Sequence, residues 1–134
     1  MAILEWKPEY SVGVLLLDAQ HQRWFEMFNQ LSAAMRTGHA EGIRDDILKQ
    51  MVTYTKTHFR SEEDYLQQQG YPELGHHKLL HQQFAHQLSE LESKLQEGRL
   101  QLTIRLLETL RDWLLSHVLK EDARYAAYLS RQQS

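Results

Sequence analysis

Histidine and acidic residues recur in this sequence at intervals that place two side chains on one face of a helix. His58 and Glu62 are four residues apart, and His77 and His81 repeat that interval. Residues four apart in an α-helix lie on the same face, one turn apart. Because imidazole nitrogen and carboxylate oxygen are both common metal ligands, these pairs indicate a metal site.

A third pair, His117 and Asp122, is five residues apart and fits the pattern less well. In a regular α-helix these two side chains would point about 140° apart. Asp122 could therefore reach a centre shared with His117 only from the flank of the helix, or if the helix is locally distorted. His21 adds one further candidate ligand.

Four helices would have to bring these residues together. Hydrophobic periodicity predicts helices over residues 18–36, 43–69, 73–96 and 102–129, with Asp18 as the N-cap of the first. Four long helices with short connections favour an all-α fold, an up-down-up-down antiparallel four-helix bundle. In that bundle all the candidate ligands lie at one end; they are His21, His58, Glu62, His77, His81, His117 and Asp122.

A buried histidine that stands alone is more often a hydrogen-bonded core residue than a ligand, so only the convergence of the whole set indicates a metal site. Seven mixed imidazole and carboxylate ligands exceed one tetrahedral site and indicate a two-metal centre bridged by carboxylates. The other three histidines, His39, His76 and His86, fall in a turn or off the apolar faces, and we expect them to be exposed to solvent.

Two other metal motifs do not fit. A zinc protease needs His-Glu-x-x-His, but Phe59 and Lys78 stand at the positions that the glutamate would occupy. Ferritin-like di-iron proteins use two Glu-x-x-His motifs. Here the one such motif runs from Glu73 to His76 at a helix start and is interrupted by Gly75.

Composition narrows the remaining classes of protein. The 134 residues are 42% hydrophobic and 25% charged, which is typical of one globular domain. We expect this domain to span residues 1–134, with an N-terminal arm over 1–17 and a polar tail over 130–134. A net charge of −3 gives no electrostatic case for nucleic acid or an anionic membrane. The absence of cysteine excludes thiolate ligands. No apolar run is long enough to span a membrane and no secretory signal is evident, so we expect a cytoplasmic protein.

Six separate stretches along the chain form a specific combination, although each alone is common. They are Trp6 with Tyr10-Ser-Val-Gly-Val14, Asp18-Ala-Gln-His21, His58-Phe-Arg-Ser-Glu-Glu63, Tyr71-Pro72, His77-Lys-Leu-Leu-His81 and Trp113-Leu-Leu-Ser-His-Val-Leu-Lys-Glu-Asp122. Through these stretches the chain resembles the bacterial hemerythrins over nearly its whole length.

The resemblance implies two non-haem iron ions with a bridging oxo or hydroxo group, and O2 as the ligand. One iron would be held by His77, His81 and His117, and the other by His21 and His58 with a position open for O2. Glu62 and Asp122 would bridge them. Four residues match positions that line the family's O2 pocket, although plain bundle core is an equal interpretation; they are Phe59, Trp113, Leu114 and Val118.

The expected function is reversible O2 binding for oxygen storage, transport or delivery to an oxygen-using enzyme, by a monomer that is not itself an enzyme. Two alternatives stay open: a di-iron peroxidase or nitric oxide scavenger or reductase, and an O2 or redox sensor acting through a separate partner. Iron rather than manganese follows from the resemblance, since histidine and carboxylate ligands suit both metals.

Overall fold

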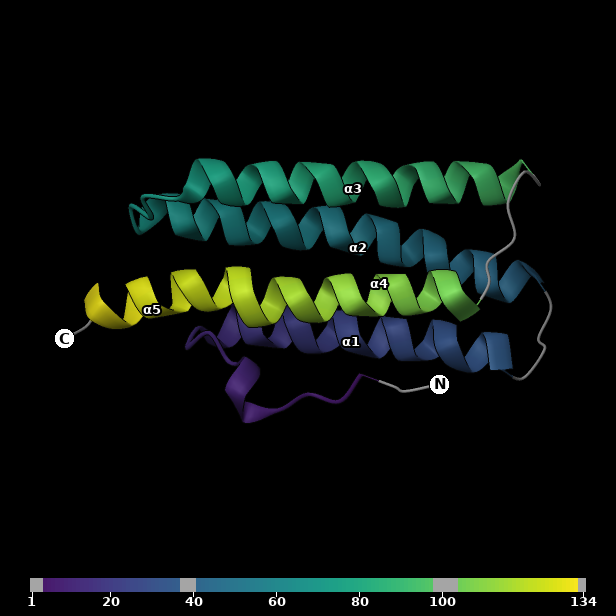
Figure 1. Cartoon of the computed structure of the whole chain (residues 1–134), viewed down its shortest axis with the longest axis horizontal. Coiled ribbons are helices and arrows are strands. Elements are labelled where there is room, and N and C mark those ends of the chain that lie inside the picture. The colour runs from purple at the N-terminus through teal and green to yellow at the C-terminus, as the bar shows by residue number, and fades with distance from the viewer. Residues whose placement is uncertain (1–3, 37–40, 98–103, 133–134) are drawn as a thin grey trace.

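Four antiparallel helices form the bundle seen in Figure 1, in a computed structural model that describes residues 4–36, 41–97 and 104–132. Three of them are the α-helices α1 (Leu15–Arg36), α2 (Glu41–Gln68) and α3 (Leu74–Gln96). The fourth consists of α4 (Ile104–Ser116), the π-helical segment η2 (His117–Asp122) and α5 (Ala123–Gln132). Successive helices run in opposite directions, and these described ranges contain no strand. The predicted all-α, up-down-up-down bundle is confirmed.

The helix boundaries differ from the prediction by a few residues at several ends. The first helix begins at Leu15 and not at Asp18, and α2 begins at Glu41, two residues before its predicted start. The last helix continues to Gln132, so the predicted polar tail is helical over its first three residues. His39 lies outside the described residues. Among these helices none is both long and apolar enough to cross a membrane.

The prediction that Asp18 caps the first helix is wrong. Asp18 lies in the first turn of α1, and its carboxylate accepts hydrogen bonds from the backbone N–H of Val12 (2.8 Å) and the hydroxyl of Ser11. The side chain therefore ties the N-terminal arm to the helix. Gly13, between arm and helix, has a φ of +79°, a backbone conformation that glycine adopts without strain.

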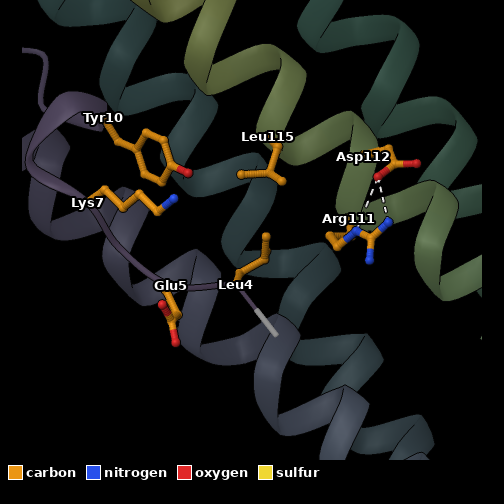
Figure 2. A pocket seen from close by; sticks show the side chains of 7 residues that line it. All are labelled: Leu4, Glu5, Lys7, Tyr10, Arg111, Asp112 and Leu115. Atoms are coloured by element: carbon orange, nitrogen blue, oxygen red, sulfur yellow. Dashed lines mark hydrogen bonds and ion pairs between the residues drawn. The ribbon is translucent and has the colours of Figure 1, made fainter. Parts of the chain in front are cut away.

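The N-terminal arm lies along α1 and contains a short 3-10 helix, η1 (Pro8–Tyr10). Leu4 is buried, and its backbone exchanges two hydrogen bonds of 2.8 Å with the side-chain amide of Asn29. Between arm and α4 is an open depression of about 320 Å³, shown in Figure 2. Arg111 pairs with Asp112 on its α4 side (2.9 Å), and none of the seven candidate ligands lines it.

The buried side chains form two apolar clusters with a polar layer between them. The larger cluster fills most of the bundle and includes Trp24, Phe59, Phe84 and Val118. The smaller cluster lies towards the connection between α2 and α3 and consists of Val12, Leu17, Leu66, Tyr71, Tyr125 and Leu129. Along each helix, the candidate ligands come between residues of these two clusters.

Candidate metal centre

The polar layer consists of the seven side chains that the sequence singles out, contributed by all four helices of the bundle. His21 comes from α1, His58 and Glu62 from α2, His77 and His81 from α3, and His117 and Asp122 from the π-helical segment η2. None of the seven is more than 4% exposed. The structure therefore brings the whole predicted set together in the interior of the bundle.

Glu62 lies at the middle of the layer, and its two carboxylate oxygens face different histidines. Its Oε1 is 2.7 Å from the Nε2 of His77 and 3.1 Å from that of His81. Its Oε2 is 3.2 Å from the Nε2 of His21 and 3.4 Å from that of His58. One carboxylate thus spans two groups of imidazoles.

Asp122 spans the layer in the same way. Its Oδ1 is 3.1 Å from the Nε2 of His117 and 3.3 Å from that of His77, whereas its Oδ2 is 3.1 Å from the Nε2 of His21. Both oxygens are buried, yet neither makes a contact with hydrogen-bond geometry to any described residue. Buried carboxylate oxygens without such partners are costly unless another ligand binds them.

The five-residue interval between His117 and Asp122 is explained by the π-helical segment that begins and ends at these two residues. A π-helix is hydrogen-bonded from i to i+5, so residues five apart lie about one turn apart and on one face. Of the two routes that the sequence left open, local distortion of the helix is the one observed. Such π-bulges are frequent at functional sites.

Two sets of ligand atoms within 4.8 Å of one another can each hold a metal ion. The first set consists of Glu62, His77, His81 and His117, and the second of His21, His58 and Glu62. In the first set the Nε2 atoms of His81 and His117 face each other at 3.2 Å, and in the second the Nε2 of His58 lacks a hydrogen-bond partner. Two sites that share one carboxylate match the chemistry of a two-metal centre.

Three residues around the layer were missed by reasoning from the sequence. The Nδ1 of His58 donates to Gln20 Oε1 and that of His81 to Glu63 Oε2, both at 2.7 Å. These bonds leave each Nε2 free to face the centre, as is usual for histidines that bind metal. The third residue, Tyr125, donates its hydroxyl hydrogen to Glu62 Oε2 at 2.8 Å.

The two carboxylates control the protonation of the layer in the absence of metal. Burial opposes protonation of His21 and His77, but Asp122 and Glu62 outweigh it and raise the pKa of each imidazole to about 10. Burial likewise opposes ionisation of Glu62, but four neighbouring imidazoles hold its pKa well below the usual range. The pKa of Asp122 is also lowered, against the effect of burial, by its imidazole neighbours.

The pKa values of two further histidines are shifted in opposite directions. The pKa of His58 is lowered, chiefly because burial disfavours its charged form. The pKa of His81 is raised, because Glu62 and Glu63 outweigh burial. In the metal-free protein the layer therefore holds protonated His21, His77 and His81 near two ionised carboxylates, and a metal ion would displace protons from these imidazoles.

The four residues expected to line an O2 pocket lie on the side of the layer that faces the larger apolar cluster. Phe59 stacks on the ring of His81 with centroids 3.7 Å apart, and Trp113 stacks on His117 at 4.8 Å. Leu114 and Val118 are buried in the same cluster. These contacts give the layer an apolar border, and contact with O2 stays a prediction.

Two histidines predicted to be solvent-exposed are so. His76 and His86 both lie on the surface of α3, where they approach Glu121 (3.8 Å) and Glu90 (3.2 Å) respectively. His86 is on the same helix as two candidate ligands but has no contact with the layer, which makes it a suitable control.

Known proteins share both the sequence and the fold. The family model described as the hemerythrin HHE cation binding domain matches residues 12–129. The chain is 32% identical to a bacteriohemerythrin of Stenotrophomonas maltophilia, over 94% of this chain and 81% of that protein. It is also 32% identical to a bacteriohemerythrin of Methylococcus capsulatus, over 97% and 99% respectively. A crystal structure of wild-type hemerythrin is 29% identical and superposes with a TM-score of 0.88, covering 94% of this chain and 97% of that one. The chain therefore belongs to the hemerythrin family.

Proposed function

We propose that this protein binds O2 reversibly at a di-iron centre in the polar layer. The observation that carries the proposal is the pair of ligand sets that share Glu62 in the interior of the bundle. Family membership supports iron as the metal, because the imidazole and carboxylate ligands alone suit several transition metals.

The contacts support one division of the ligands between the two metal ions. We infer that His77, His81 and His117 hold one ion, and that His21 and His58 hold the other. Glu62 and Asp122 would bridge the two ions. In each carboxylate one oxygen faces the imidazoles of the first group and the other oxygen faces those of the second group. The ion with two imidazoles has fewer protein ligands, so it is the one that keeps a position open for O2.

When bound, the iron pair supplies a redox-active coordination site for O2. The residues of the chain compensate the charge of the metal and shield its ligands. The negative charges of Glu62 and Asp122 offset part of the positive charge of the metal, and the rings of Phe59 and Trp113 cover two of the imidazoles against water. A water-poor border of this kind protects a bound ligand from displacement.

The burial of the layer limits the size of the molecules that can reach it. Because every candidate ligand is at most 4% exposed, only a small molecule such as O2 can reach the layer without displacing side chains. We infer that the protein binds O2 for storage, transport or delivery. Peroxide and nitric oxide are equally small, and a turnover assay distinguishes a binding protein from an enzyme that acts on them. Delivery to an oxygen-using enzyme, a monomeric state, a single domain and a cytoplasmic location stay predictions.

The experiment is reduction of the iron-loaded protein without oxygen, followed by exposure to air. We expect a visible charge-transfer band that disappears under argon and returns with air. Irreversible bleaching at the first exposure would contradict reversible binding. Steady consumption of peroxide or nitric oxide in the presence of a reductant, absent from a His77→Ala variant, would instead indicate an enzyme.

A further inference from the structure

Tyr125 is a buried polar residue in the smaller apolar cluster, and the division of ligands above gives it no role. We propose that Tyr125 is a positioning residue: its hydroxyl holds the Glu62 carboxylate in the bridging orientation and so sets the affinity of the metal site at His21 and His58. The inference rests on the proposed two-metal centre and adds a specific determinant of its second site.

The hydrogen bond is directed at only one of the two carboxylate oxygens. The Tyr125 hydroxyl lies 2.8 Å from Glu62 Oε2, the oxygen that also faces His21 and His58. The other oxygen, Oε1, faces His77 and His81. The contact therefore distinguishes the two sides of the carboxylate.

An external hydrogen bond is needed because a glutamate side chain does not fix its own carboxylate plane. The terminal torsion of glutamate is broad and has no sharp rotamer minimum. An ionised carboxylate oxygen has two lone pairs, so Glu62 Oε2 can accept the Tyr125 hydrogen and still present a lone pair to a metal ion. Hydrogen bonds to ionised acceptors are about twice as strong as neutral ones, and this one is shielded from water.

The position of Tyr125 is itself well determined. It lies in the first turn of α5, three residues after Asp122, at which the π-helical segment ends. Its ring packs edge-on against His77, with centroids 5.5 Å apart, and against Tyr71 at 6.3 Å. The π-helical segment that aligns Asp122 with His117 is followed by the turn of α5 that brings the Tyr125 hydroxyl within hydrogen-bond distance of Glu62.

Loss of the hydroxyl should affect the two metal sites unequally. The ion at His77, His81 and His117 would keep three imidazoles even if the carboxylate turned. The ion at His21 and His58 has only two, so it depends more on a correctly oriented bridge. The expected signature is selective weakening of one site.

The test is a titration of metal-free protein with Co²⁺, whose visible spectrum reports each site as it fills, in the unsubstituted chain and in Tyr125→Phe. Phenylalanine keeps the ring and removes only the hydroxyl. We expect the second Co²⁺ to bind about 10–100-fold more weakly and the first to change by less than about threefold.

Tyr71→Phe is the matched control. Tyr71 contacts the ring of His77 at 6.5 Å, but its hydroxyl donates to Glu73 at 3.4 Å, away from the layer. This variant should bind both ions as the unsubstituted chain does. Equal weakening of both sites in Tyr125→Phe, or no weakening of either, would overturn the inference while leaving the two-metal centre intact.

Two further outcomes are also decisive. If the unsubstituted chain binds fewer than two Co²⁺, the two-metal centre and this inference both fail. If Tyr125→Phe does not fold, the unsubstituted protein loaded with Zn²⁺ gives the answer by NMR. The Tyr125 hydroxyl proton should then exchange slowly with water, and exchange as fast as that of Tyr71 would overturn the inference.

Discussion

The larger apolar cluster and the polar layer are equally buried, yet they differ in what they need in order to be stable. In the cluster, side chains such as Leu31 and Leu107 have no exposed surface and are stabilised by contact with one another. In the layer, two ionised carboxylates and five imidazoles share the interior, and both oxygens of Asp122 lack a hydrogen bond within the described chain. The apolar side chains of the cluster stabilise one another without a ligand, whereas the buried polar atoms of the layer need a bound ligand as their partner.

The cost of burying the polar layer without a ligand can be compared with the stability of the whole domain. A buried polar group without a partner costs about 1–3 kcal/mol. Several such groups together rival the total stability of a typical domain, about 5–15 kcal/mol. The contacts of Glu62 with its imidazole neighbours relieve part of this cost in the metal-free protein. Metal should therefore stabilise the layer and leave the apolar cluster unchanged.

The largest effect is expected from removing a candidate ligand in the layer. His77→Ala deletes one of the three imidazoles proposed for the first metal site and the partner of Glu62 Oε1 at 2.7 Å. We expect loss of at least one of the two metal ions per chain and loss of the native visible spectrum, measured by metal analysis and optical absorption.

The matched control is His86→Ala, which removes a histidine from the same helix at an exposed position. This variant should keep both ions. If His77→Ala also kept two ions and an unchanged spectrum, the assignment of the three-histidine site would be wrong.

Sequence periodicity predicted burial better than it predicted contacts. It placed all seven candidate ligands in the bundle interior because each lies on or beside the apolar face of its helix. It could not choose between a flank approach and a distorted helix for Asp122, since sequence periodicity assumes a regular α-helix and the π-helical segment departs from one. It also missed Tyr125, which lies 63 residues from Glu62 and follows no ligand spacing. Asp18 was misassigned as a cap because the same carboxylate chemistry binds the arm.

The second prediction compares the two regions directly through thermal unfolding. Chelation of the metal under reducing conditions should lower the melting temperature and speed hydrogen exchange around His58 and His117. By contrast, Leu107→Ala should lower the free energy of unfolding by about 2–5 kcal/mol in both the metal-loaded and the chelated protein, because it leaves a cavity in the apolar cluster. Equal melting temperatures for the loaded and chelated protein would contradict a buried centre.

The third prediction concerns pH. Since the pKa of His21 and of His77 is raised from 6.5 to about 10, their protonated forms stabilise the metal-free fold. This contribution is fully present below about pH 6.5 and is lost as the pH rises towards 10. The lowered pKa of His58 opposes it only on the acid side, where its protonation would destabilise the fold.

The melting temperature of the chelated protein should therefore fall between pH 6.5 and 10. Metal affinity should rise over the same interval, because binding displaces protons from the imidazoles. Leu107→Ala should lower the melting temperature without changing either trend. A metal affinity that is independent of pH would contradict the protonated network.

The smallest effect is expected at the edge of the layer. Glu63→Gln weakens the acceptor of the His81 Nδ1 hydrogen bond but keeps its shape. We expect about a tenfold loss of metal affinity at the three-histidine site. Glu90→Gln, beside the exposed His86, is the control and should have no effect. Titration with Co²⁺ measures both, and equal affinities for Glu63→Gln and Glu90→Gln would show that the hydrogen bond does not support the ligand.

The most direct test of the di-iron assignment is the number of iron ions per chain, measured together with the optical spectrum of the oxidised protein. We expect two irons per chain and the spectrum of an oxo-bridged ferric pair, both lost in His77→Ala and both retained in His86→Ala. One iron per chain, or two irons without a bridged spectrum, would contradict a centre in which Glu62 and Asp122 join two metal sites.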